Sequence, residues 1–263
     1  MTVKGGVKLE ASFHFLKIQR IESHDQKAAT FHITGEARPR EFKSKNDEDL
    51  LDVVITIVGQ LKNTLPLIPY QELVKVELKP EARQKQVEME SSRLMENLTS
   101  PEVHSVHGFV TVYAFLCRYY GIPFREDVAW NTSEIYLSHG FRVLKLNDFE
   151  QHNQRLLLPL VSALGHNVYF EGVQNKDNEL SPEVATALIN VLQNPHRHGF
   201  KTLVLSNAGL KRDVASRLLG AVRANPKSSL THLDLSYNRL DDQCMESLCQ
   251  ALSHLPHLSL IHI

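Results

Sequence analysis

The order of leucine and polar residues between positions 230 and 240 predicts a short strand followed by a tight turn. Leu233 and Leu235 are two residues apart, so their side chains point to the same side of an extended segment. Leu230 and Leu240 enter and leave this segment on its apolar side. Asn238 stands where the chain must turn, and its short amide can bond there to backbone groups. One such unit cannot bury its own apolar side, so the pattern predicts similar units before and after it.

Apolar residues recur at the same offsets in neighbouring segments. The spacing is 30 residues from Val173 to Leu203 and from Leu203 to Leu233, and it is 28 residues from Leu233 to Ile261. These segments follow the leucine-rich-repeat pattern L-x-x-L-x-L-x-x-N-x-L. The further apolar positions of the repeats are Phe170, Leu180, Phe200, Leu205, Leu210, Leu258 and Ile263.

Two positions depart from this pattern, since Asn175 replaces a strand leucine and Ala208 replaces the asparagine. Helical stretches over residues 182–192, 213–224 and 242–252 follow the strands. A strand with a full helix is the long form of the repeat, which predicts an α/β solenoid of the ribonuclease-inhibitor-like subclass over residues 169–263. Because the sequence stops inside a repeat, we expect a truncated solenoid whose last apolar residues, Leu258, Ile261 and Ile263, form an uncovered edge.

Residues 101–168 are expected to form the helical cap that covers the first open end of the solenoid. Ser100 and Pro101 predict the start of a helix, and Gly121 predicts its end. The segment Leu144-x-Leu146 predicts a first strand, and residues 156–164 predict a helix after it. The apolar side of the first helix contains Val106, Phe109, Val110, Tyr113 and Leu116.

The first 66 residues predict a small module of a different kind. Alternating apolar and polar residues indicate strands over residues 7–13, 15–21 and 28–34, and an apolar stripe at helical spacing over residues 47–65 ends at Pro66. Strands followed by one helix resemble a pleckstrin-homology (PH) domain, which has seven strands. Residues 1–66 are therefore expected to form a partial PH-like β module with a C-terminal helix. Residues 67–100 are expected to be a linker, whose charged part is a solvated helix or a flexible segment.

Composition narrows the possible functions. The net charge of −1 gives no electrostatic case for nucleic-acid binding. Three cysteines form no paired framework, which fits the reducing cytosol. The sequence shows no signal peptide and no apolar run that could span a membrane. His104 with His107, and His196 with His198, lack a third metal ligand at a known spacing. We therefore expect neither an enzyme, a cofactor nor a small-molecule substrate.

The chain resembles the CARMIL family, which regulates actin capping protein. The resemblance is carried by Gly108-Phe109, by Tyr120-Gly121-Ile122-Pro123-Phe124 continuing to Trp130, by Ile135-Tyr136-Leu137 and by residues 203–210. Residues 7–10 and 13–18 resemble the late strands of the family's PH domain.

This resemblance implies a non-enzymatic scaffold of the actin cytoskeleton, located in the cytoplasm and peripherally at the plasma membrane. Its implied partners are proteins of the actin machinery and anionic phospholipid. It also implies that the chain is the N-terminal portion of such a protein, truncated at both ends and lacking the tail that binds capping protein. The alternative is a generic leucine-rich-repeat module that binds an unrelated cytosolic protein as an inhibitor or sensor.

Two surfaces are predicted to bind partners. The outward-facing strand positions of the solenoid would form a concave protein-binding face, and basic residues of the first module would meet lipid headgroups. The face comprises Gly172, Gln174, Lys176, Thr202, Val204, Ser206, His232, Asp234 and Ser236, and the basic set comprises Lys4, Lys8, Arg38, Arg40, Lys43 and Lys45. An ordinary solvated sheet face and a solvated loop are the corresponding alternatives.

Overall fold

A computed structural model describes residues 12–23, 27–46, 48–96, 103–149, 153–225 and 228–263. The chain divides into two compact units. The first contains residues 1–62 and 69–97, and the second contains residues 63–68 and 98–263. No helix among the described residues is long and apolar enough to cross a membrane.

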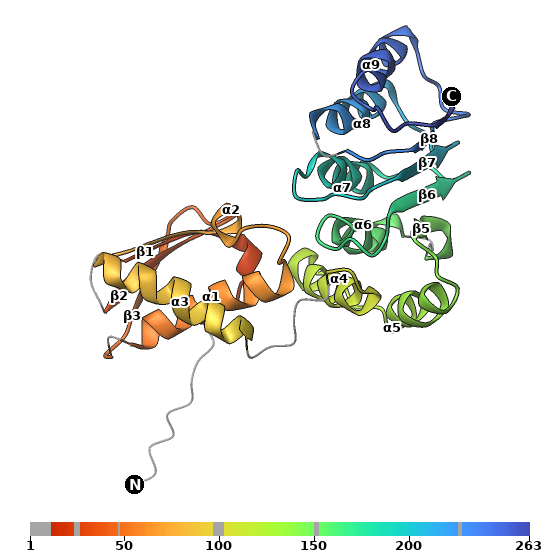
Figure 1. The fold of residues 1–263 in the computed structure, drawn as a ribbon. Helices are drawn as coiled ribbons and strands as arrows, with labels where there is room; N and C mark the ends of the chain where they lie inside the picture. The colour runs from red at the N-terminus through yellow and green to blue at the C-terminus, as the bar shows by residue number, and fades with distance from the viewer. Residues whose placement is uncertain (1–11, 24–26, 47, 97–102, 150–152, 226–227) are drawn as a thin grey trace. The chain divides into compact units, whose positions relative to one another are not determined.

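The first unit has a four-stranded sheet with the order β3-β2-β1-β4. Strands β1 (Ile18–Ser23), β2 (Ala28–Ile33) and β3 (Arg40–Lys43) are antiparallel neighbours, whereas β4 (Lys75–Leu78) pairs in parallel with β1. Helices α1 (Asp49–Thr64) and α3 (Glu81–Glu96) lie on one face of this sheet, and the short helix α2 (Tyr70–Leu73) precedes β4 (Figure 1). Ile18, Ile21 and Phe31 turn towards the core and are buried.

The structure differs from the expectation for this unit in three places. Residues 67–100 were expected to be a linker, but they contribute β4 and α3 to the first unit. A 3-10 helix, Phe15–Lys17, occupies the start of the strand expected over residues 15–21, so that strand begins at Ile18. Helix α1 is followed by a parallel strand, so it is not the last element of the unit. The strand expected over residues 7–13 lies almost entirely outside the described residues.

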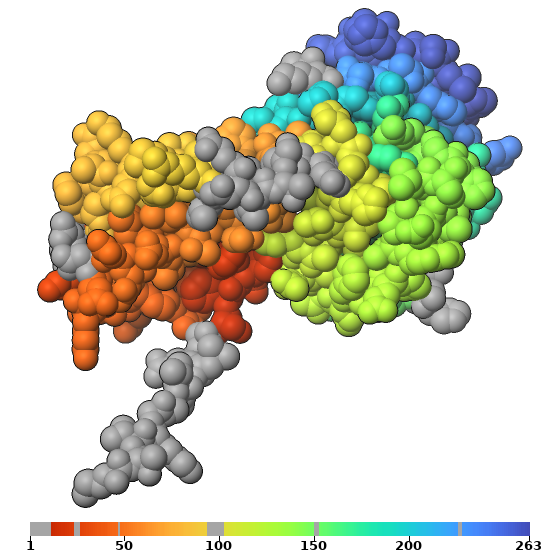
Figure 2. All heavy atoms as spheres, turned by 60° about the horizontal axis from the view of Figure 1, so that its bottom comes forward, coloured from red at the N-terminus to blue at the C-terminus, as the bar shows by residue number. Residues whose placement is uncertain are grey.

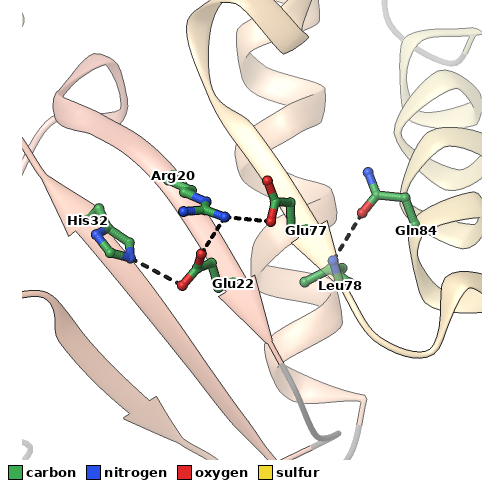
Figure 3. Close-up of polar contacts among 6 residues, drawn as sticks. All are labelled: Arg20, Glu22, His32, Glu77, Leu78 and Gln84. Carbon is green, nitrogen blue, oxygen red and sulfur yellow. Dashed lines mark hydrogen bonds and ion pairs between the residues drawn. The ribbon is translucent and has the colours of Figure 1, made fainter.

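Ion pairs cross the three neighbouring strands β2, β1 and β4 (Figure 3). Arg20 on β1 contacts Glu22 at 2.7 Å and Glu77 on β4 at 2.6 Å. His32 on β2 reaches the other oxygen of Glu22 at 3.3 Å. The Arg20–Glu77 pair joins β4 to β1, although paired residues of these two strands are 55 residues apart in the sequence.

The second unit alternates parallel strands with helices (Figure 1). Its five strands follow chain order: β5 (Val143–Lys145), β6 (Gly172–Lys176), β7 (Thr202–Ser206), β8 (His232–Asp234) and β9 (Leu260–His262). Helices α6 (Leu158–Ala163), α7 (Pro182–Gln193), α8 (Arg212–Ala224) and α9 (Asp242–Leu252) lie between them. The predicted alternation of strands and helices is thereby confirmed, and the ribonuclease-inhibitor-like subclass stays a prediction.

One apolar row runs through the stacked strands. Leu144, Val173, Leu203 and Leu233 follow one another in register, and each is 0% exposed. Ile261 continues the row on β9 and is 37% exposed. The row is therefore continuous and is completely buried from β5 to β8.

Helical elements, which are the predicted cap, precede β5. Helix α4 (Val106–Tyr120) is followed by helix α5 (Glu126–Trp130), which continues into a π-helix, Asn131–Tyr136. Gly121 adopts the left-handed conformation that ends α4, as predicted. Helix α4 begins at Val106 with Ser105 as its N-cap, and the predicted start at Ser100 and Pro101 lies outside the described residues. In the space-filling view the cap, in yellow-green and green, and the repeats, in cyan and blue, form one continuous body (Figure 2).

Asn238 joins two neighbouring repeats. Its Oδ1 accepts hydrogen bonds from the backbone N–H groups of Ala208 and Leu210, both at 3.1 Å. Its Nδ2 donates to the carbonyl oxygens of Leu205 and Leu235 at 2.7 and 2.8 Å. One short amide thus satisfies backbone groups of two successive turns, which confirms its predicted role.

Arg197 lies in the loop after α7 and is only 1% exposed. Its Nε donates to the carbonyl oxygen of Leu164 at 2.7 Å, and its Nη atoms donate to those of Phe170 and His198. Burial lowers the pKa of Arg197 to about 10. The guanidinium therefore crosslinks the end of α6 to the following turns through carbonyl oxygens, with the cation placed favourably at a helix C-terminus.

His166 should make the stability of the second unit depend on pH. Its Nδ1 is buried and has no hydrogen-bond partner among the described residues, and burial lowers its pKa to about 4 from an ordinary value of 6.5. Below pH 6.5 the imidazole of His166 becomes protonated in the unfolded chain, whereas in the folded chain it stays neutral until the pH approaches 4. We expect about 2 kcal/mol of stability to be lost between pH 7 and pH 5.

Urea unfolding of the His166→Asn variant at both pH values checks this expectation. The variant should lose this part of the pH dependence, whereas His107→Asn, at an exposed position on α4, should retain it. Equal pH dependence in the wild type and in His166→Asn would show that His166 is not responsible.

A candidate protein-binding face on the parallel sheet

The outward side chains of β5 to β9 form one surface, which we call the sheet face. Because side chains alternate along a strand, residues between the buried leucines point away from the helices. Register places Gln174, Val204 and Asp234 in one row across β6, β7 and β8. The sheet face comprises Lys145, Gln174, Lys176, Thr202, Val204, Ser206, His232, Asp234, Ser236 and His262.

The structure brings together most of the predicted face residues. Lys176 pairs in register with Ser206, and Thr202 pairs with His232. The hydroxyl groups of Ser206 and Ser236 are 2.9 Å apart. Gly172 also lies in this sheet, where a Cβ atom would come within 2.4 Å of the Thr202 carbonyl oxygen. Glycine is thus required by the close approach of the two strands, which gives Gly172 a structural role.

Three of the predicted face residues, Gly172, Val204 and Ser206, are buried. Val204 is only 4% exposed and Ser206 is 9% exposed. Neighbouring strands lie only about 5 Å apart, so the longer side chains of adjacent positions cover these small residues. Val204 and Ser206 therefore offer little surface to a partner, and the accessible part of the sheet face lies around them.

Asp234 carries a stabilised negative charge on this surface. Its Oδ1 accepts hydrogen bonds from the Ser236 backbone N–H at 3.0 Å and from the Ser236 hydroxyl at 2.6 Å. Partial burial opposes ionisation, but these bonds, with His262 and Lys176 nearby, hold the pKa of Asp234 below its ordinary value. The sheet face therefore presents a carboxylate between basic side chains, which suits a partner with mixed charges.

Sequence analysis missed Lys145 and His262, which flank the predicted residues at the two ends of the row. Both follow an inward apolar residue of the repeat pattern, so the same offset rule identifies them. Lys145 pairs with Gln174, and Asp234 pairs with His262.

Tyr237 borders the sheet face in a strained conformation. Its φ angle is +59°, and its side chain is 84% exposed. Asp177 and Asn207 occupy the equivalent positions of the preceding repeats with φ angles of +56° and +49°. Aspartate and asparagine tolerate this left-handed region better than a bulky tyrosine does.

Replacing Tyr237 with asparagine should therefore raise the free energy of unfolding by about 1 kcal/mol. Thermal unfolding of the Tyr237→Asn and Tyr237→Ala variants measures this effect. Alanine lacks the short polar side chain by which asparagine can bond to the local backbone in this region, so it should give much less stabilisation. A lower melting temperature for Tyr237→Asn than for the wild type would contradict the assignment of strain.

Two of the predicted lipid-binding residues, Arg40 and Lys43, form ion pairs with neighbouring glutamates. Arg40 donates two hydrogen bonds to Glu36, both at 2.6 Å, and these bonds lower the pKa of Glu36. Lys43 is 3.2 Å from Glu41. Arg38 and Lys45 are exposed, and Lys4 and Lys8 lie outside the described residues. The basic set is thus diluted by acidic neighbours.

No site for metal chemistry is visible in the described part of the chain. No three histidine, cysteine, aspartate or glutamate side chains gather there in a group that could hold a metal ion. Cys117 and Cys244 are buried and Cys249 is exposed, all as free thiols.

Comparison with known proteins finds long stretches of similarity. The chain is 36% identical over 160 residues to capping protein, Arp2/3 and myosin-I linker protein 2 of Mus musculus, which is 58% of this chain and 12% of that protein. It is 25% identical over 245 residues to Protein CARMIL of Dictyostelium discoideum, covering 90% of this chain and 21% of that protein. Rho GTPase-activating protein gacW of Dictyostelium discoideum is 22% identical over 240 residues, covering 90% of this chain and 20% of that protein.

The chain thus spans only 12% to 21% of the length of these three relatives. No family model matches the chain.

Proposed function

Because the chain is a homologue of the CARMIL proteins, we propose that it acts as a non-enzymatic scaffold of the actin cytoskeleton and takes part in the regulation of actin capping protein. The similarity over 90% of the chain to the Dictyostelium CARMIL protein carries this proposal. The name of the relative from Mus musculus gives the proteins to test, which are capping protein, Arp2/3 and myosin-I.

The sheet face is the proposed contact surface. It is formed by five strands in continuous register, so a partner can touch several repeats at once. Its accessible part includes Lys176, Asp234 and His232, which offer charge and hydrogen bonding to a protein surface. Rigid stacked repeats position these side chains without a large ordering cost on binding.

Direct binding to purified proteins tests the proposal. The full chain is titrated against capping protein, the Arp2/3 complex and myosin-I in separate experiments, with serum albumin as the control. We expect saturable binding to at least one of the three and none to albumin. Absence of binding to all three would refute a scaffold role that acts through this part of the protein.

A second candidate is a generic leucine-rich-repeat module with a different protein partner in the cytosol. The similarity to a Rho GTPase-activating protein favours it, because a region of the same extent occurs in a protein with another name and role. Under this candidate the sheet face binds a protein that is not part of the actin machinery. The titration separates the two candidates.

The proposal also includes peripheral contact with anionic phospholipid. Each basic residue near a charged membrane contributes about 1 kcal/mol, and Arg38 and Lys45 are the exposed members described here without a carboxylate partner. Co-sedimentation with phosphatidylserine vesicles should be weak and should decrease as salt is raised. Absence of binding, or binding that does not respond to salt, would refute the proposed contact with anionic phospholipid.

A further inference from the structure

Four basic side chains of the sheet face form no ion pair with another described residue. They are Lys145 on β5, Lys176 on β6, His232 on β8 and His262 on β9. Lys176 and His262 act on Asp234 only through longer-range attraction. The sheet face thus carries four basic side chains and one carboxylate, in a chain whose net charge is −1.

The carboxylates in and beside the sheet face already accept hydrogen bonds within the chain. Asp234 accepts two from Ser236. Asp148, which follows β5, accepts one from a tyrosine hydroxyl at 2.7 Å, and Asp177, which follows β6, accepts one from an asparagine amide at 3.0 Å. The negative groups therefore have partners, whereas the basic side chains are left to contact a negatively charged partner.

Lys145 is held in place by an aromatic pair. Its Nζ lies 5.3 Å from the centroid of the Phe141 ring, a distance at which a cation is attracted to an aromatic face. The ring of His139 stacks on Phe141 with the two centroids 5.3 Å apart. The ammonium group is thus positioned at the β5 end of the sheet face, which lowers the entropy that it loses on binding.

Lys145 and His262 stand at the two ends of one row of paired residues across β5 to β9. Because neighbouring strands lie about 4.8 Å apart, this row crosses the sheet over about 19 Å. An extended segment of about six residues covers the same distance. Lys176 and His232 occupy the next outward positions beside the row, so a segment with several carboxylates can meet all four basic side chains.

The two histidines make the charge of the sheet face depend on pH. Their rings lie 6.3 Å apart. The charged groups beside them are Lys176, Asp234 and Lys201, of which Lys201 is paired with Glu171 at 2.7 Å. The outward residues of β7 carry no charge. Since histidine gains a proton as the pH falls below neutrality, the face becomes more positive in weakly acidic solution.

We propose that the sheet face binds an acidic segment of a partner protein, with Lys145, Lys176, His232 and His262 contacting its carboxylates. This inference rests on the proposed function, because it names the chemistry of the partner that the same face binds. A protein segment is favoured over nucleic acid, because the face has only two permanent positive charges and Asp234 repels a phosphate backbone.

Titration of the full chain with synthetic probes tests the proposal. The first probe is a fluorescent peptide of about ten residues that alternates glutamate and serine and is long enough to cross the row. A peptide with lysine in place of glutamate, and single-stranded DNA of the same charge as the first peptide, are the controls. We expect saturable binding of the glutamate peptide that weakens as salt is raised. Absence of this binding, or equally tight binding of the lysine peptide or the DNA, would overturn the proposal.

The dependence of this binding on pH tests the histidines. The wild type should bind the glutamate peptide about fivefold more tightly at pH 6 than at pH 7.5. The variant His232→Asn with His262→Asn should lose most of this gain. His107→Asn with His254→Asn, at exposed positions outside the sheet face, is the matched control and should keep it. Circular dichroism at both pH values verifies that each variant is folded, and equal pH dependence of the two double variants would overturn the proposal.

Lys145→Gln should weaken binding of the glutamate peptide about threefold, and Lys211→Gln, at the N-terminus of α8, should leave it unchanged. Equal affinity of the two variants would contradict the role given to Lys145. The peptide titration also separates this inference from the proposed function. If an actin-machinery protein binds and the glutamate peptide does not, the proposed function stands and this inference fails. If only the peptide binds, the acidic partner class stands and the proposed partners fail.

Discussion

The Asn238→Ala variant is expected to lose about 3 kcal/mol of the free energy of unfolding of the second unit. The asparagine accepts hydrogen bonds from Ala208 and Leu210 and donates to Leu205 and Leu235. Alanine can do neither, and each buried backbone group left without a partner costs about 1–3 kcal/mol. Some of these groups are only partly buried and can be reached by water, so the lower part of the summed range applies.

Urea unfolding followed by the fluorescence of Trp130 measures this loss, because Trp130 is the single tryptophan of the chain and lies in the second unit. Asn190→Ala, at an exposed position on α7, is the matched control and should change the stability by less than about 0.5 kcal/mol. Equal stability of the two variants would mean that Asn238 does not join the repeats as described.

Replacing Arg197 with alanine is expected to destabilise the second unit by about 3–5 kcal/mol. The buried guanidinium supplies donors to the carbonyl oxygens of Leu164, Phe170 and His198. Truncation leaves these acceptors without donors and opens a cavity around Phe200, over whose ring the guanidinium lies at 5.5 Å. Removal of the desolvation cost of the charge offsets only part of this loss.

The Arg197→Lys variant separates the effect of the positive charge from that of the planar guanidinium. A lysine ammonium is a compact donor on a flexible stem and cannot reproduce the planar fork that serves three carbonyl oxygens. We expect it to recover less than half of the loss measured for alanine. Arg217→Ala, at an exposed position on α8, is the control. Full recovery with lysine would show that the positive charge, and not the fork, holds these turns together.

The repeats could be predicted from the sequence because each rests on a local rule. Side chains alternate in strands, the short amide of Asn238 can bond to backbone groups at a turn, and a glycine ends α4. Ser100-Pro101 and Ser105 both have the residue types of helix starts, and sequence alone did not show that Ser105 is the N-cap of α4.

The role of residues 67–100 could not be predicted for a different reason. Strand β4 has four residues, of which only Leu78 is buried, and α3 is largely polar. What stabilises them is long-range: β4 pairs in parallel with β1, and Lys62 donates hydrogen bonds to Glu88 and Ser91 of α3. The pattern of apolar and polar residues within 67–100 does not indicate that this segment pairs with β1 or bonds to Lys62.

The candidate face was predicted by position but not by accessibility. Alternation assigns Val204 to the outward side, yet its burial depends on the side chains of the adjacent strands. The buried state of Arg197 was missed because arginine in a loop is ordinarily exposed. Only the stacking of the turns shows that carbonyl oxygens surround it.

A comparison of two charge reversals decides whether the sheet face is the binding surface. Lys176→Glu changes an exposed residue of the face, and Lys211→Glu makes the same change at the N-terminus of α8, away from the strands. The dissociation constant of each variant is measured with whichever actin-machinery protein binds the wild type. We expect Lys176→Glu to weaken binding at least tenfold and Lys211→Glu to leave it unchanged. Equal affinity of Lys176→Glu and the wild type would contradict binding through this face.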